Sequence, residues 1–236
     1  MKTISILGAS SFVSISFIEF IQKYNEFELK LLCREKKKLN QLFYNKKIKI
    51  YFYEPRNIKS INKDFFKTDI IINFLGNYND QSIEFPNYIL PLLIFKESLS
   101  YNVRNWINLS SIGVYDKSFY KIDENTPENP INKYEKLKLK LDKDLINLSQ
   151  THNIKLIILR PSSIIGISMK SDYLRRLIQI VKFRLFFFIE DKNSIANLVN
   201  VEDLNSILFE CIKSEDKNSN IYNISENISY ADLIQI

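Results

Sequence analysis

Residues 4–14, with the sequence ISILGASSFVS, decide the fold of this chain. A short apolar run ends at Gly8, two serines follow, and a helical pattern begins at Phe12. This order of strand, turn and helix start is typical of an open parallel sheet, in which ligands bind beyond the carboxyl ends of the strands. A helix N-terminus at that place offers free backbone N–H groups and a partial positive charge to a phosphate.

The glycine pattern of this turn differs from that of dinucleotide-binding turns. Where Gly-x-x-Gly-x-x-Gly would be expected, the chain has Gly8, Ser11 and Ser14. Serine is small enough for a close approach of the backbone, although a positive φ costs it more than glycine. We therefore predict phosphate binding around Gly8, Ser10, Ser11 and Phe12. The alternative is that Ser10 or Ser11 only caps the helix.

Working outward, short apolar runs alternate with longer helical patterns, which predicts right-handed crossovers and a Rossmann-like, doubly wound parallel sheet of the α/β class. The expected strands are residues 3–7, 28–33, 48–52, 69–74, 104–109 and 154–159. The expected helices are residues 12–24, 35–43, 86–101 and 131–150. The later elements are helices at 172–182, 202–213 and from Ser229, and strands at 184–189, 197–201 and 221–224.

No Gly/Ser/Pro-rich linker divides the chain, so we expect a core over residues 1–160 and a small, apparently shortened substrate-side lobe over 161–236, interleaved with the last core elements. The chain ends inside an expected helix, which suggests a substrate pocket that is reduced, completed by a second subunit or cut short.

Composition narrows the class of protein. The 236 residues are 45% hydrophobic and 25% charged, which excludes a collagen, a low-complexity polymer and a disordered tail. The 2 cysteines are too few for a disulfide framework and favour a reducing, cytoplasmic setting. The single histidine, His152, excludes a His-clustered metal site, and we expect no metal. No apolar run reaches the length of a membrane span.

The net charge of +6 fits an anionic ligand. The basic residues are spread along the chain, so we expect a small anionic molecule as the ligand, and a basic nucleic-acid face is the less favoured alternative. At the end of the second expected strand stands Arg34, where many dinucleotide folds carry an acidic residue for the ribose hydroxyls. Arginine suits a 2′-phosphate, so we expect NADP(H) to be favoured, with NAD(H) possible. The alternative is a charged helix start without a ligand.

Two further stretches carry residues suited to acid–base chemistry. Ser110 and Ser111 follow the fifth expected strand directly. The next long helix opens with Tyr134 and Lys138 in a Tyr-x-x-x-Lys pattern, and residues four apart lie on one helix face. An ordinary amphipathic helix with a half-buried tyrosine is the alternative, since the chain has 13 tyrosines.

With these blocks in order, the chain resembles the extended short-chain dehydrogenase/reductase family, in its NAD-dependent epimerase/dehydratase branch. The resemblance runs from the first strand to about residue 230. It rests on Ser-Ser-x-x-Val-Tyr at 110–115, Pro-x-x-x-Tyr-x-x-x-Lys at 130–138, Arg160-Pro161 with Gly166, and the run Asn-Val-Glu-Asp-Leu at 200–204. The stretch 69–76 resembles the family's fourth strand and the cofactor-lining turn after it, and Asn87 a family asparagine of the next helix segment.

The resemblance implies roles for individual residues. Tyr134 would exchange a proton with the sugar hydroxyl or ketone, Lys138 would hold the nicotinamide ribose and lower the Tyr134 pKa, and Ser111 would hydrogen-bond the reacting oxygen, with Ser110 the weaker candidate. A free phenol has a pKa near 10, and lowering it by about three units needs roughly 4 kcal/mol. Other implied cofactor contacts are Phe74, Leu75, Gly76 and Pro161.

Two functions from different classes follow. The first is an NAD(P)-dependent oxidoreductase that reduces or epimerises C4 of a nucleotide-linked hexose, in surface-polysaccharide precursor synthesis, with a possible homodimer through residues 86–101 and 131–150. The second is a non-catalytic dinucleotide-binding scaffold or redox sensor with a protein or RNA partner, which the altered glycine pattern favours and the retained Ser111, Tyr134 and Lys138 oppose.

The chain has only 4 glycines. They follow the first, fourth, fifth and sixth expected strands, as Gly8, Gly76, Gly113 and Gly166. Because those turns share one edge of a doubly wound sheet, we predict that the glycines mark the active edge.

Overall fold

A seven-stranded parallel sheet forms the centre of the computed structural model. The structure describes residues 1–34, 39, 43, 47–54, 57–78, 83–119, 121–167, 169, 179–183, 195–229 and 231–232. The strands are β1 (Lys2–Leu7), β2 (Phe27–Cys33), β3 (Ile48–Phe52), β4 (Ile70–Asn73), β5 (Asn105–Leu109), β6 (Lys155–Pro161) and β9 (Asn220–Ile224). Their order is β3-β2-β1-β4-β5-β6-β9, and each neighbouring pair is parallel, as the sequence predicts.

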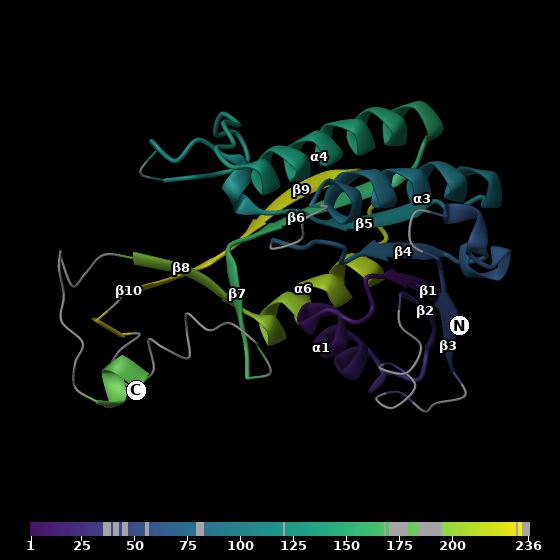
Figure 1. Ribbon diagram of the computed structural model, residues 1–236, viewed down its shortest axis with the longest axis horizontal. Coiled ribbons are helices and arrows are strands. Elements are labelled where there is room, and N and C mark those ends of the chain that lie inside the picture. The colour runs from purple at the N-terminus through teal and green to yellow at the C-terminus, as the bar shows by residue number, and fades with distance from the viewer. Residues whose placement is uncertain are drawn as a thin grey trace.

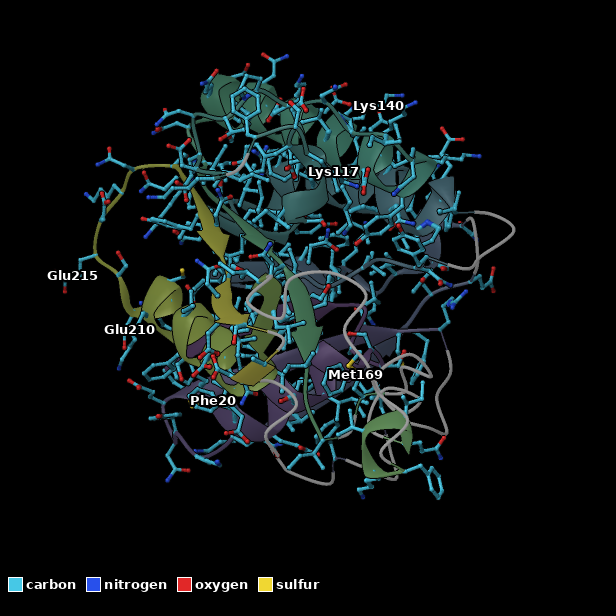
Figure 2. The ribbon with its side chains drawn as sticks, turned by 90° about the vertical axis from the view of Figure 1, so that its left-hand side faces the viewer. Phe20, Lys117, Lys140, Met169, Glu210 and Glu215 are labelled. Atoms are coloured by element: carbon cyan, nitrogen blue, oxygen red, sulfur yellow. The ribbon has the colours of Figure 1, made fainter. Side chains whose placement is uncertain are left out.

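Helices cover both faces of this sheet (Figure 1). One face carries α1 (Phe12–Ile21) and α6 (Val201–Lys213), and the other carries α3 (Leu90–Ser98) and α4 (Lys133–His152). In the side-chain view, Lys117 and Lys140 lie on the α4 side, whereas Phe20 and Glu210 lie on the side of α1 and α6 (Figure 2). The predicted Rossmann-like architecture is therefore confirmed.

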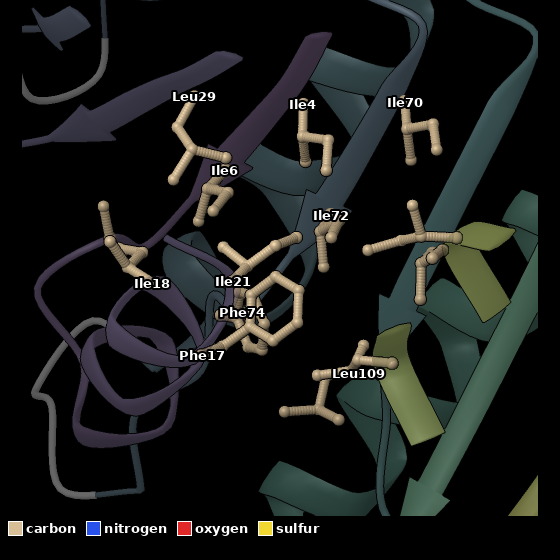
Figure 3. Packing of buried hydrophobic residues seen from close by; sticks show 14 of the residues in the cluster. Ile4, Ile6, Phe17, Ile18, Ile21, Leu29, Ile70, Ile72, Phe74 and Leu109 are labelled. Atoms are coloured by element: carbon tan, nitrogen blue, oxygen red, sulfur yellow. The ribbon is translucent and has the colours of Figure 1, made fainter. Parts of the chain in front are cut away.

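The core has two parts, one on each face of the sheet. Ile4 and Ile6 pack against Phe17 of α1 on one face (Figure 3), while Leu7 of the same strand belongs to the cluster under α3 and α4. Successive strand residues point to opposite faces, so a strand buried on both sides needs a continuous apolar run. Each fully buried large apolar side chain contributes about 1.5–3 kcal/mol relative to an exposed one.

A second, three-stranded sheet lies beside the main one (Figure 1). It contains β7 (Ser163–Ile165), β8 (Ile195–Asn200) and β10 (Glu226–Ser229) in the order β10-β8-β7. The pattern missed β7 and β10, which have only 3 and 4 residues. Residues 161–236 thus supply this sheet as well as β9 and α6 of the core, and the division into a core and a substrate-side lobe stays a prediction.

Local capping explains where α4 begins. The Asn132 side chain accepts from the Glu135 N–H at 2.9 Å, and Glu135 Oε2 accepts from the N–H of Asn132 at 3.2 Å. This capping box starts the helix at Lys133 instead of residue 131. Asn153, in the left-handed region with φ 52°, ends it after His152, which is exposed at the helix end.

The helix expected at 86–101 forms three pieces. A π-helical turn at Phe85–Ile89 precedes α3, and a 3₁₀ turn at Leu99–Tyr101 follows it. Pro91 has no N–H to donate to the Asn87 carbonyl, which interrupts the α-helical ladder where the π turn meets α3.

Other boundaries differ from the prediction by a few residues. Helix α1 ends at Ile21 instead of residue 24, and β8 spans Ile195–Asn200 instead of 197–201. The predicted start of the last helix at Ser229 was wrong, because Ser229 is the last residue of β10. The Ser229 hydroxyl accepts from the Asp232 N–H, and residues 231–232 are helical. The expected strand at 184–189 and most of the helices at 35–43 and 172–182 lie outside the described residues.

Within the described residues, no helix is both long and apolar enough to cross a membrane.

Candidate active site

The turn after β1 meets the turn after β4 where the order of strands reverses. Gly8 has φ +71°, a conformation that L side chains rarely adopt. A Cβ on Gly8 would lie 3.1 Å from the Leu75 nitrogen and 3.2 Å from the Phe74 carbonyl oxygen. Gly8, Phe74 and Leu75 are therefore neighbours at the switch point of the sheet, which is the place where doubly wound folds bind ligands.

Helix α1 points its N-terminus at this turn. The Ser11 hydroxyl accepts from the Ser14 N–H at 3.1 Å, so the predicted cap is formed. The cap occupies one N–H of the first turn and leaves those of Phe12 and Val13 suited to a phosphate. Ser14 is fully buried, and its hydroxyl has no partner among the described residues. The helix thus accepts serine at the third glycine position, at the cost of one unsatisfied hydroxyl.

Arg34 is exposed and directly follows β2, the strand that pairs with β1 on the side away from β4. Burial raises the pKa of the Tyr53 phenol, and the Arg34 charge nearby opposes that rise. This arrangement fits a dinucleotide. Gly8 forms the left-handed turn, the start of α1 offers backbone N–H groups to the phosphates, and Arg34 offers a cation to the ribose end.

The Lys138 ammonium is buried between the ends of two central strands. Its Nζ donates to the Leu75 carbonyl and to the Leu109 carbonyl, both at 2.9 Å. A Cβ on Gly76 would lie 3.2 Å from this Nζ, so the glycine provides the space for the ammonium. Burial lowers the pKa of Lys138 to about 8, which leaves it mainly charged at neutral pH. Two of its three N–H groups are thus committed, and the third remains for a ligand.

Tyr134 lies one turn before Lys138 on α4, and the Lys138 Nζ is 5.7 Å from its ring centroid. The predicted juxtaposition of the two side chains is confirmed. The Tyr78 ring packs on Tyr134 with centroids 4.7 Å apart, and the Tyr78 hydroxyl accepts from Asn132 Nδ2 at 3.0 Å. Burial, and then the neighbouring groups Tyr78, Asp142 and Glu135, raise the pKa of Tyr134 to about 12. The protein alone therefore keeps the phenol protonated. The contact of Tyr78 with Tyr134 was not predicted.

The two serines have different environments. Ser110 is buried, and its hydroxyl donates to Asp142 at 2.7 Å. Ser111 is half-buried, and its hydroxyl accepts from the Gly113 N–H at 3.1 Å. Its own proton is thus left for another acceptor, which agrees with the choice of Ser111 over Ser110. A Cβ on Gly113 would lie 2.9 Å from Glu135 Oε1, so this glycine lets the serine turn pack against the start of α4.

Three other predicted positions lie around these groups, at Asn87, Pro161 and Gly166. The buried Asn87 side chain accepts from the Asn77 N–H at 3.2 Å and donates to the Asn77 carbonyl at 2.9 Å, which fixes the turn after Gly76. Pro161 is buried at the end of β6, and its cofactor contact stays a prediction. Gly166 follows β7 instead of the sixth strand, and a Cβ there would lie 2.8 Å from the Phe12 ring.

A buried polar network behind the site was missed. Its members are Asn73, Asn108, Asp142 and Arg160, none more than 1% exposed. Asn73 follows three apolar residues at the end of β4, Asn108 follows two near the end of β5, and Asp142 stands four residues after Lys138, so the spacing held a signal that we did not interpret.

Within the described residues, no group of three His, Cys, Asp or Glu side chains could hold a metal ion. Cys211 is half-buried, and burial raises the pKa of its thiol to about 11, which makes it unreactive at neutral pH.

The fold brings Ser111, Tyr134 and Lys138 to the edge of the sheet at which doubly wound folds bind their ligands. The model of the NAD dependent epimerase/dehydratase family matches residues 4–225, and the chain belongs to that family.

Solved structures of similar fold come from several organisms. The UDP-Glc/GlcNAc 4-epimerase of Campylobacter jejuni is 19% identical with a TM-score of 0.82, over 100% of this chain and 82% of that one. The UDP-glucuronic acid 4-epimerase of Bacillus cereus, in complex with NAD, is 16% identical with a TM-score of 0.81, over 98% and 81%. The Bordetella bronchiseptica enzyme WbmG, also with NAD, is 14% identical with a TM-score of 0.80, over 99% and 76%. No curated protein sequence matches the chain.

Proposed function

We propose that this chain is a nicotinamide-dependent oxidoreductase that reduces or epimerises C4 of a nucleotide-linked hexose. The observation that carries the proposal is the Lys138 ammonium, which is fixed by the carbonyls of Leu75 and Leu109 beside the Tyr134 ring at the switch point of the sheet. Family membership and the UDP-sugar 4-epimerases among the similar structures support the substrate class.

When bound, the nicotinamide accepts or returns the hydride at the sugar carbon. Tyr134 supplies the proton. Because its pKa is raised to about 12, the phenol is protonated at neutral pH and is ready to donate to a C4 ketone oxygen. The Ser111 hydroxyl donates a second hydrogen bond to the same oxygen, which stabilises the negative charge that develops there.

Lys138 stabilises the phenolate left on Tyr134. Two opposite unit charges separated by 5.7 Å, the distance from Nζ to the ring centroid, attract by about 3 kcal/mol at an effective dielectric constant of 20. That corresponds to roughly two pK units, which is less than half of the about five units that separate a pKa of about 12 from neutral pH; the bound cofactor would have to supply the rest. The free N–H of Lys138 is available for a ribose hydroxyl.

For the cofactor, NADP(H) is our preferred choice over NAD(H). Arg34 stands at the end of β2, where a guanidinium would pair with a 2′-phosphate. NADP(H) fits net reduction better than epimerisation, because an epimerase recycles a tightly held cofactor.

We further propose a homodimer formed through α3 and α4. Leu93 is 40% exposed on α3, and an apolar side chain at that position suits burial against a second copy. Light scattering at two protein concentrations tests this, and a mass of one chain at both would contradict it.

The test of the proposed activity is turnover. The protein is incubated with NADPH and a dTDP-4-keto-6-deoxyhexose, and separately with NAD and UDP-sugars, while nicotinamide absorbance and product composition are followed. We expect turnover in one arm. An absence of turnover in every arm, with the protein folded, would remove the enzyme assignment and leave a dinucleotide-binding scaffold.

A further inference from the structure

A closed circuit of hydrogen bonds connects Lys138 with Asp142, the residue one turn further along α4. Lys138 Nζ donates to the Leu75 carbonyl at 2.9 Å, and the Leu75 N–H donates to Asn73 Oδ1 at 3.0 Å. Asn73 Nδ2 donates to Asn108 Oδ1 at 2.8 Å, and Asn108 Nδ2 donates to Asp142 Oδ1 at 3.0 Å. Each amide acts once as donor and once as acceptor, so the circuit fixes both amide orientations.

The other carboxylate oxygen of Asp142 is also fully used. Oδ2 accepts from Ser110 Oγ at 2.7 Å and from Arg160 Nε at 3.2 Å. Nη2 of Arg160 donates to Glu128 Oε1 at 2.7 Å. The buried carboxylate is therefore paired and hydrogen-bonded on both sides, as a buried charge must be.

The charged and titratable groups around the circuit are few. Among the described residues, Lys138 faces Tyr134 and Asp142 from its own helix, the Leu75 carbonyl from the turn after β4 and the Leu109 carbonyl from β5. Asp142 faces Arg160 from β6. Burial lowers the pKa of Lys138 to about 8, and the Asp142 charge opposes that fall. Burial raises the pKa of Asp142 to about 6, and Arg160 opposes that rise first.

We propose that Asp142 is a positioning residue of this site: its carboxylate closes the circuit through Asn108, Asn73 and Leu75 and thereby holds the Lys138 ammonium charged and in place. The carboxylate acts in two ways. As a counter-charge one helical turn away, it favours the protonated form of Lys138. As an acceptor, it locks the two strand ends whose carbonyls bind the ammonium.

A purely structural brace would behave differently from a positioning residue. A brace only holds β5 and β6 against α4, so its removal lowers stability and leaves the titration of Lys138 unchanged. The proposed counter-charge also sets the pH at which Lys138 loses its proton. The titration of one ammonium group therefore separates the two roles.

The experiment is an NMR titration of the full chain with ¹³Cε-labelled lysine, in which the Lys138 signal is assigned by its loss in Lys138→Met. We expect a midpoint near 8 in the unmodified protein. In Asp142→Asn, which keeps the shape and removes the charge, we expect the midpoint to fall by about one pH unit. A midpoint that moves by less than about 0.3 units overturns the proposal.

Glu128→Gln is the matched control. It removes a carboxylate from the far side of Arg160 and leaves the circuit closed, so the Lys138 midpoint should stay within about 0.3 units. A shift as large as that of Asp142→Asn would also overturn the proposal, because any nearby carboxylate would then have the same effect.

Arg160 keeps Glu128 as a partner in Asp142→Asn, which favours folding. If the variant nevertheless fails to fold, the double variant Asp142→Asn/Arg160→Met removes both buried charges, a replacement that proteins often tolerate. Asp142 is the charge that acts on Lys138, so the midpoint should still fall in the double variant. An unchanged midpoint contradicts the proposal.

For the reaction, this inference rests on the proposed function, and activity gives a second measurement. At pH 8 we expect kcat of Asp142→Asn to fall about fivefold, as the protonated fraction of Lys138 falls, with KM for the sugar nearly unchanged because the ammonium does not contact the sugar. A chain without turnover would remove the proposed function and leave the NMR result standing. An active chain with an unmoved Lys138 midpoint would remove only the role of Asp142.

Discussion

Gly8→Ala tests the geometry of the switch point most stringently. An alanine at φ +71° costs about 1–2 kcal/mol, because its Cβ crowds the neighbouring backbone. The new Cβ would also lie 3.1–3.2 Å from three backbone atoms of Phe74 and Leu75, which cannot rotate away. That overpacking adds about 1 kcal/mol, and the lower entropy of the unfolded alanine chain returns about 0.4–1 kcal/mol. The expected net loss is about 2 kcal/mol.

Thermal and urea unfolding measure this loss. For a chain of 236 residues, about 2 kcal/mol corresponds to a Tm lower by roughly 4–8 °C. To relieve the crowding, the turn at residue 8 has to shift, and the start of α1 shifts with it away from the proposed phosphate position. We therefore expect the Kd for NADPH to rise at least about tenfold.

Gly76→Ala is the matched control for stability. Gly76 has no positive φ, and the nearest atom to its Cβ is the far end of the Lys138 side chain, at 3.2 Å. We expect a loss below about 1 kcal/mol, because no backbone strain is added and the closest contact is with a single side-chain atom that has to move by only a few tenths of an ångström. If Gly8→Ala were as stable as Gly76→Ala and bound NADPH as well as the unmodified protein does, the described turn could not be the cofactor turn.

Three further substitutions follow from the same structure. Asn153→Gly should raise the free energy of unfolding by about 0.5–1 kcal/mol in urea titrations, because glycine adopts the left-handed helix cap without strain; a loss of stability would contradict the cap. Glu135→Ala should cost about 1–2 kcal/mol through loss of the capping box. Burial alone would raise the Glu135 pKa, but hydrogen bonds and the Lys117 charge together lower it. The stability that Glu135 contributes is therefore present at neutral pH and is lost as the pH falls through the lowered pKa. An equal loss of stability in acid for the unmodified protein and the variant would refute this prediction. Arg34→Ala should weaken NADPH binding about tenfold and leave NADH binding within twofold in fluorescence titrations, and an equal loss for both would exclude the 2′-phosphate role.

The sequence was sufficient for the architecture because strands buried on both faces need uninterrupted apolar runs. The strands expected at 3–7, 69–74 and 104–109 correspond to β1, β4 and β5, which are neighbours in the sheet. Short edge elements gave no such signal: β7 and β10 have 3 and 4 residues, too few to show a period.

The side chains expected to face the ligands were predicted from the sequence, whereas the buried polar residues that support them were not. Tyr134 and Lys138 share a helix face, and this follows from their spacing alone. The Asn73, Asn108 and Asp142 circuit joins three elements, and the partner of a buried amide is set by strand register, which a single sequence does not reveal. The contact of Tyr78 with Tyr134 depends in the same way on the path of a loop.

The central claim is that Tyr134, held beside the Lys138 ammonium, moves the proton in a nicotinamide-dependent reaction at a nucleotide sugar. The most direct test is kcat of Tyr134→Phe with the nucleotide sugar that the unmodified protein turns over, beside the Kd for the cofactor and the unfolding curve. We predict a fall in kcat of about 10²–10⁴-fold, with the cofactor Kd within a few-fold and the fold intact. An unchanged kcat in a folded variant would contradict the account.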